Sequence, residues 1–216
     1  DTALENNNVN HGNTNSATVG GTYDQTVEHN GGHLDDSGFD NLSKFKGAEL
    51  LDAFAYGNFE LSGMPLNLRI GRQVVNWGES TFIKGGINSI NAIHQNELTN
   101  ISTEIKEALL PTNMLSMKLG LSNDLSMEAF YLMDFQESVM PGCGTYFSMA
   151  DTASPGCDTA TVNYYESNIK RNEDGIRKPS DHGQYGFAFR YIAESLAETE
   201  LSLYWKTQHS TLANIS

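Results

Sequence analysis

Apolar and polar residues alternate with a period of two in several stretches of the chain after residue 49. The pattern appears in pairs of stretches that are separated by turn-forming residues, at residues 51–70, 115–133 and 185–206. Such alternation is typical of β-strands that have two different faces. The pattern therefore predicts three antiparallel hairpins, with strands of about ten residues.

The two faces of each predicted hairpin differ in chemistry. One face is apolar, with aromatic residues near the strand ends, and the other is small or polar and carries the charged residues Lys118, Glu128, Arg190 and Lys206. A strand of about ten residues has the length that a tilted strand needs to cross a bilayer. A soluble sandwich would turn the apolar face toward its core, whereas an outer-membrane barrel would turn it toward lipid. Periodicity alone leaves both interpretations open.

The connection between the first two hairpins contains a helical pattern at about residues 98–110. Leu98, Ile101, Ile105 and Leu109 would share one helical face, and Pro111 would end the helix. We expect a short amphipathic helix that packs against the sheet or constricts the lumen of a barrel.

Residues 1–43 differ from the remainder of the chain. They are rich in Asn and Gly, contain seven acidic residues and have no Lys or Arg. Because few apolar side chains are available to offset the entropy of ordering, we expect a long solvated loop or a disordered arm. Residues 44–216 would then hold the hairpins.

Composition excludes several classes of protein. The formal net charge of −14 is a poor match to nucleic acid, whose phosphates select clustered Lys and Arg. No apolar run approaches the roughly 18 residues that a membrane-spanning helix needs. None of the common catalytic motifs is present, and no pair of acidic residues stands out by its spacing. We therefore expect no enzymatic activity, no catalytic residue, no cofactor and no metal site.

Cys143 and Cys157 are the only cysteines, and each follows a Pro-Gly pair within the segment 141–158. Two such turns bracketing a short loop suit a local disulfide, which would imply an oxidising compartment. The alternatives are two free thiols or half of a metal site. Zinc is disfavoured because there is no CxxC motif and no His between the two cysteines.

Several longer motifs carry a resemblance to a known family. The motifs lie in the same order as in that family and are Arg69–Ile83, Lys106–Pro111, Leu125–Tyr131, Gly144–Ser148, Gly183–Tyr191 and Thr199–Leu201. Over residues 46–210 the chain resembles the DUF1302 family of Gram-negative bacteria. The resemblance implies an outer-membrane β-barrel with neither an enzymatic activity nor a set of catalytic residues.

The family context suggests the handling of lipids or other hydrophobic compounds at the cell envelope. Family members tend to be encoded beside a periplasmic DUF1329-type partner and RND-type exporters. They are longer than this chain and have strands on both sides of the matching region. We therefore expect an all-β, antiparallel transmembrane barrel with long loops and a short helix, of which this chain is a portion. The alternative is a soluble β-rich envelope module that binds a periplasmic partner and forms no channel.

Candidate functional residues follow from the barrel interpretation. An Arg that faced lipid near the middle of the membrane would cost about 2 to 4 kcal/mol, so charged residues at that depth should face the lumen. Arg69 and Arg72 fall on opposite faces of a strand, and Glu79 and Glu107 are candidate partners for them. The candidates for lumen or ligand contact are Arg69, Arg72, Gln73, Asn76, Glu79, Lys118, Glu128, Arg190 and Lys206. The expected membrane-interface aromatics are Trp77, Tyr185, Tyr191 and Trp205.

Overall fold

The three predicted hairpins form one antiparallel sheet. The computed structural model describes residues 36, 38–78, 86–99, 108–142, 155, 159–161, 168–170 and 176–212. Within them, six long strands pair in the order β1-β2-β5-β6-β9-β10. The strands are β1 (Ala53–Leu61), β2 (Met64–Gln73), β5 (Thr112–Gly120), β6 (Leu125–Leu132), β9 (Tyr185–Ala193) and β10 (Thr199–Thr207). The all-β prediction is confirmed.

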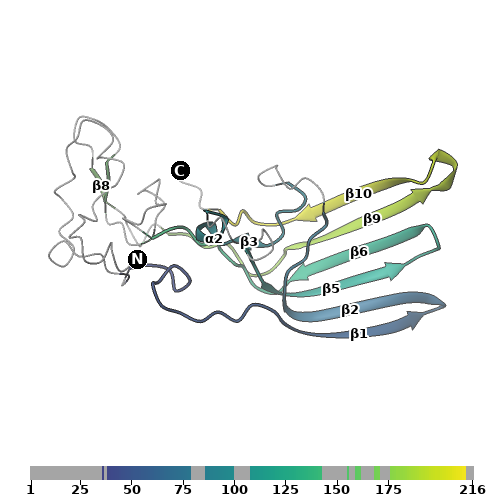
Figure 1. Cartoon of the computed structure of the whole chain (residues 1–216), viewed down its shortest axis with the longest axis horizontal. Helices are drawn as coiled ribbons and strands as arrows, with labels where there is room; N and C mark the ends of the chain where they lie inside the picture. The colour runs from purple at the N-terminus through teal and green to yellow at the C-terminus, as the bar shows by residue number, and fades with distance from the viewer. Residues whose placement is uncertain are drawn as a thin grey trace.

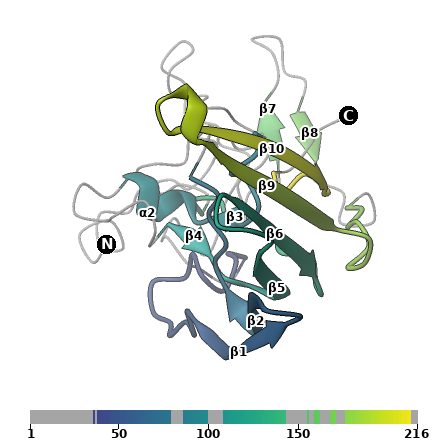
Figure 2. The same cartoon turned by 90° about the vertical axis from the view of Figure 1, so that its right-hand side faces the viewer.

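The sheet is open in the described part of the chain. Each strand is antiparallel to its neighbours, while β1 and β10 form the two edges and do not pair with each other. Figure 2 views the strands from the end where the hairpins turn and shows them in sequence from β1 to β10. No closed barrel is therefore formed by the described residues.

The two ends of the sheet are built differently. The three hairpin turns lie at the same end, and helix α2 (Gln95–Thr99) and β3 (Ala92–Ile93) lie at the other (Figure 1). The β1–β2 turn needs only Ser62 and Gly63, both of which have positive φ, as in the tight turns that suit the twist of a hairpin. The connections between β2 and β5 and between β6 and β9 are much longer. Short turns at one end and long connections at the other are typical of outer-membrane barrels.

Two smaller sheets lie outside the main one. β3 pairs with β4 (Leu109–Leu110), and β7 (Thr159–Thr161) pairs with β8 (Asn168–Lys170). A 3₁₀ turn, η4 (Glu194–Leu196), lies between β9 and β10. A helix with the length and apolar character that a membrane crossing needs is absent from the described residues.

The helix expected at residues 98–110 has different bounds. Helix α2 begins earlier, at Gln95, and ends at Thr99. Leu109 and Leu110 form strand β4 instead, because their backbones pair with Ile93 and Ala92. The residues between 100 and 107 lie outside the described part, so the middle of the predicted helix stays a prediction.

The end of the predicted acidic arm is folded. Residues 1–35 lie outside the described part, but Phe39 and Ser43 are buried. Ser43 Oγ donates to the Met140 carbonyl at 2.8 Å, and the Phe39 ring packs directly over Gly142. The last residues of the predicted arm therefore contact the 140–142 segment, while the division of the chain at residue 43 stays a prediction.

The register places alternate residues on two distinct faces of the sheet. Pairs such as Leu115 with Tyr131 and Phe189 with Leu203 share one face, which we call the apolar face. Large side chains of this face are exposed on each of the three hairpins, for example Phe59 at 57%, Leu115 at 40% and Leu203 at 67%, although Leu119 is buried. The opposite face, which we call the polar face, holds the main buried cluster. That cluster consists of Trp77, Ile90, Met114, Phe130, Leu132 and Ala188.

Candidate functional site

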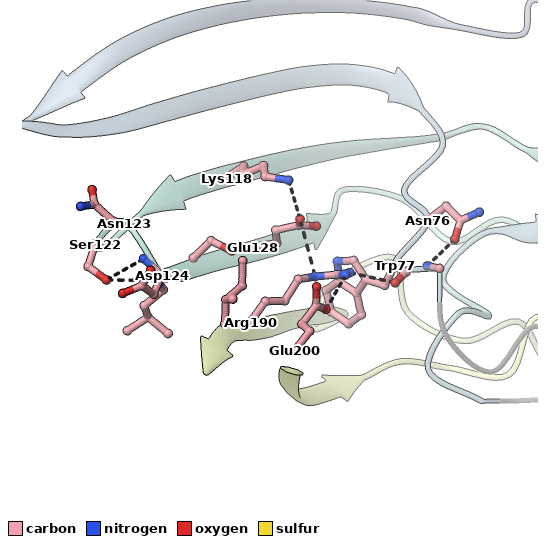
Figure 3. Close-up of a pocket in the computed structure, with 13 residues that line it drawn as sticks. Asn76, Trp77, Lys118, Ser122, Asn123, Asp124, Glu128, Arg190 and Glu200 are labelled. Carbon is pink, nitrogen blue, oxygen red and sulfur yellow. Dashed lines mark hydrogen bonds and ion pairs between the residues drawn. The ribbon is translucent and has the colours of Figure 1, made fainter. Parts of the chain in front are cut away.

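Four charged residues form a row across the polar face. Lys118 lies directly opposite Glu128 in the β5–β6 register, and its Nζ is 3.0 Å from Glu128 Oε1. Arg190 in β9 follows, with Nε 4.0 Å from Glu128 Oε1 and Nη1 3.4 Å from Glu200 Oε1. The charges therefore alternate along the row, as Figure 3 shows. The two inner members, Glu128 and Arg190, are less exposed than Lys118 and Glu200 at the ends.

Arg190 also reaches beyond the row to a distant segment of the chain. Its Nη2 donates to the backbone carbonyl of Trp77 at 2.8 Å. Its guanidinium lies 5.7 Å from the centre of the Tyr204 ring, within the range of a cation–π interaction. One side chain thus joins the charged row to the residues that follow β2.

The chain after β2 turns inward over the polar face. We call residues 74–78 and 86–91 the inner segment. Trp77 and Ile90 of this segment are each 1% exposed and pack on Met114 and Phe130 of the sheet. The Trp77 ring lies 5.2 Å from the ring of Phe130 and 5.6 Å from that of Tyr204.

Polar side chains hold the backbone of the inner segment. Asn91 accepts a hydrogen bond from the Val75 amide at 3.0 Å and donates to the carbonyls of Gln73 and Leu110. Asn88 accepts from the Trp77 amide at 3.2 Å. These bonds give hydrogen-bond partners to the Val75 and Trp77 amides, which lie outside the strands, as the burial of an irregular segment requires.

Lys206 in β10 provides a second cationic contact to the inner segment. Its Nζ donates to the carbonyl of Ser89 at 3.0 Å, and the Ser89 and Gln208 side chains lie within 3.4 Å of it. Gln208 in turn donates to the carbonyl of Ile90. Lys206 and Arg190, on neighbouring strands, therefore both bind backbone oxygens of the inner segment.

A cavity of about 690 Å³ is bounded by three parts of the protein: the inner segment, the charged row and the β5–β6 turn (Figure 3). This size is suitable for a small molecule. Its wall is mainly polar, with Leu125 and Ile192 as apolar members. The lining residues are Asn76, Trp77, Gly78, Lys118, Ser122, Asn123, Asp124, Leu125, Ser126, Glu128, Arg190, Ile192 and Glu200. The described residues contain no group of three or more His, Cys, Asp or Glu side chains that could hold a metal ion.

The structure separates the predicted candidates into groups. Asn76, Lys118, Glu128 and Arg190 come together at the cavity. Gln73 is buried, donates to the Met114 carbonyl and accepts from Ser116 Oγ, so it supports the sheet. Glu79 and Glu107, the expected partners of the arginines, lie outside the described residues.

The two arginines of β2 lie away from the cavity. Arg69 is on the polar face, where its guanidinium lies 5.5 Å from the centre of the Phe54 ring. Arg72 lies on the opposite face at the end of the strand, where Nη2 is 3.4 Å from Glu49 Oε1 and Nε donates to the Leu50 carbonyl. Glu49, which precedes the first predicted hairpin, is therefore the acidic partner of Arg72.

The four predicted interface aromatics do not all lie on the same face of the sheet. Tyr185, Tyr191 and Trp205 are between 43% and 46% exposed on the apolar face. Trp77 is the exception, because it is 1% exposed and packs on the polar face instead. The Asn76 side chain accepts a hydrogen bond from the Gly78 amide, and Gly78 has a positive φ, so the chain turns at this point and buries the indole.

Sequence reasoning missed other members of the site. Glu200 and Tyr204 could have been found, because they alternate with the apolar residues of the same predicted strand. Asp124 lies in the β5–β6 turn, where acidic residues are common for local reasons and give no sign of a cavity. Nothing in the local pattern marks Asn88, Ser89 or Asn91 as contacts of the sheet, since their partners lie far away in the sequence.

The fold and site thus define an all-β protein with an open antiparallel sheet, one apolar face and one polar face that bears a charged cavity. Comparison with protein families gives a match over residues 1–216 to the family described as "Protein of unknown function (DUF1302)". The chain belongs to this DUF1302 family. Comparisons with curated proteins and with solved structures give no match.

Proposed function

We propose that this chain forms part of the wall of an outer-membrane β-barrel in a Gram-negative bacterium. The barrel would take part in the passage or trafficking of lipids or other hydrophobic solutes. The observation that carries the proposal is the apolar face, which runs across all six strands and exposes large apolar side chains on each of the three hairpins. No enzymatic step is part of this proposal.

Lipid is the environment that suits such a face. Soluble monomers rarely expose a contiguous apolar patch larger than a few hundred Å². The rings of Tyr185 and Trp205 contact each other at a tilted angle on this face, with ring centres 5.2 Å apart, and remain more than 40% exposed. In a soluble sandwich these rings would be enclosed by a second sheet. In a membrane, acyl chains would cover these rings, and the hydrogen bonds between the strands would stay unchanged.

Strand length and layout support the same proposal. The six long strands have 8 to 10 residues each, close to the roughly 9 to 11 that a tilted strand needs to cross a bilayer. In bacterial outer-membrane barrels the short turns face the periplasm and the long loops face outward. We infer the same orientation here, with Ser62–Gly63 on the periplasmic side.

The polar face would then line a water-filled interior. A row of four charges is costly beside lipid but is well solvated in a lumen. The cavity beside it offers room for the polar part of a solute. The hydrophobic class of solute follows from the family context described above, and a DUF1329-type protein is the proposed periplasmic partner.

Detergent dependence tests this proposal. The full-length protein should partition with membranes, require detergent for solubility and migrate faster on gels before heating than after. A barrel resists unfolding by cold detergent, which accounts for the mobility shift. If the protein is monodisperse in plain buffer and shows no heat-dependent mobility, it is instead a soluble envelope module that binds a periplasmic partner.

A further inference from the structure

We propose that the inner segment is a constriction of the barrel interior, and that Arg190 and Lys206 hold it in place. The inference rests on the proposed barrel function and adds to it the residues that set the width of the passage. It concerns residues 74–78 and 86–91 and their contacts with the sheet.

The first observation is where the inner segment lies. Trp77 and Ile90 are buried against Met114, Phe130 and Ala188, whose side chains all belong to the polar face. In a barrel that face is the inner wall, so the segment occupies interior space. The indole and the rings of Phe130 and Tyr204 form an apolar contact on a wall that is otherwise polar.

The second observation is how the segment is attached. Arg190 binds the carbonyl of Trp77, and Lys206 binds the carbonyl of Ser89, although more than 100 residues separate the partners in each case. Both cations come from the adjacent strands β9 and β10 and reach two different parts of the segment. Two independent anchors on one wall are the arrangement expected of a segment that must keep its position while solutes pass.

The third observation is what remains open beside the segment. The cavity of about 690 Å³ is bounded by Asn76, Trp77 and Gly78 on one side and by Lys118, Glu128 and Arg190 on another. A solute that moves along this wall passes between the inner segment and the charged row. Arg190 is part of the charged row and also binds the Trp77 carbonyl of the inner segment, so it connects the two sides of the cavity. It is therefore a positioning residue that sets the width of the passage.

Conductance of the full-length protein in planar lipid bilayers tests the inference. Arg190→Met and Lys206→Met should each raise the single-channel conductance, because each releases one anchor and lets the segment move away from the wall. Arg190→Lys, which keeps a cation near the Trp77 carbonyl, should stay closer to the parent. Arg177→Met removes an exposed arginine outside the sheet and serves as the matched control.

A second readout follows the segment itself. With Trp77 as the sole tryptophan, its emission should shift to the red in Arg190→Met and in Lys206→Met but not in Arg177→Met. If one of the two anchor variants does not fold, as judged by heat-dependent mobility, the other variant still tests the inference. This is possible because Arg190 and Lys206 bind different carbonyls. Unchanged conductance and emission in a correctly inserted barrel would overturn the constriction and leave the proposed barrel intact. If no form of the protein shows heat-dependent mobility, the barrel proposal fails, and the constriction fails with it.

Discussion

Trp77 and Trp205 lie on opposite faces of the same six-stranded sheet. Trp77 contacts the ring of Tyr204, the residue immediately before Trp205 in β10, yet it is 1% exposed. Trp205 stacks on Phe187 with ring centres 5.1 Å apart and is 44% exposed on the apolar face. Successive side chains of a strand point to opposite faces. Strand β10 therefore contacts Trp77 through Tyr204 on the polar face and presents Trp205 on the apolar face.

This relationship predicts the result of fluorescence quenching in membranes. With Trp205 as the sole tryptophan, lipids brominated in their acyl chains should quench the emission strongly. With Trp77 as the sole tryptophan, the same lipids should have little effect, because the sheet lies between the indole and the lipid. Equal quenching of both tryptophans would contradict the assignment of the two faces.

Arginine substitutions on neighbouring residues of β10 should have very different costs. Leu203 is on the apolar face, and Ser202 is on the polar face. In a bilayer Leu203→Arg should lower the free energy of unfolding by about 2 to 4 kcal/mol. Ser202→Arg, on the polar face, places a second guanidinium directly opposite Arg190 and removes the Ser202 hydrogen bond to Glu200, so we expect it to cost about 0.2 to 1 kcal/mol, still well below Leu203→Arg.

Denaturant titration in phospholipid vesicles measures both values. In a soluble module Leu203→Arg would cost little, because the side chain is already exposed to water. Two small and equal effects would therefore argue against lipid contact.

Removal of the Asn91 side chain should destabilise the inner segment. Asn91→Ala leaves the Val75 amide and the carbonyls of Gln73 and Leu110 without this partner. A buried group without a partner costs about 1 to 3 kcal/mol, so the free energy of unfolding should fall by at least that amount. Asn123→Ala, in the exposed β5–β6 turn, is the matched control and should be nearly neutral in the same denaturant titration.

The layout of turns and connections predicts the orientation in the membrane. An epitope inserted between Ser62 and Gly63 should be reached by antibody only after cells are permeabilised, because this turn would face the periplasm. An epitope inserted between Arg177 and Lys178, in the long connection before β9, should be reached on intact cells. The reverse result would invert the orientation while leaving the barrel itself unaffected.

The disulfide between Cys143 and Cys157 stays a prediction, because both residues lie outside the described part of the chain. Protein made in an oxidising compartment and analysed without reductant should have the mass of a form that has lost two hydrogen atoms. Two free thiols under these conditions would refute the bridge. Either result leaves the sheet and the inner segment unaffected.

The sequence by itself determined the strands, their faces and the family. Alternation of Tyr185, Phe187 and Phe189 with Gly186, Ala188 and Arg190 is a local property, and the strand geometry converts it directly into two faces. Turn residues such as Ser62 and Gly63 are equally local. Long motifs were sufficient for the family, and the β-rich architecture agreed with them.

The tertiary structure alone decided how the site is assembled. Trp77 looked like an interface residue because aromatic residues at strand ends often are, but its burial depends on Phe130 and Tyr204, which come from other hairpins. The contact of Arg190 with the Trp77 carbonyl likewise requires β9 to lie beside β6 in the correct register. Strand order and register arise from the packing of the whole sheet, which no local pattern of residues encodes.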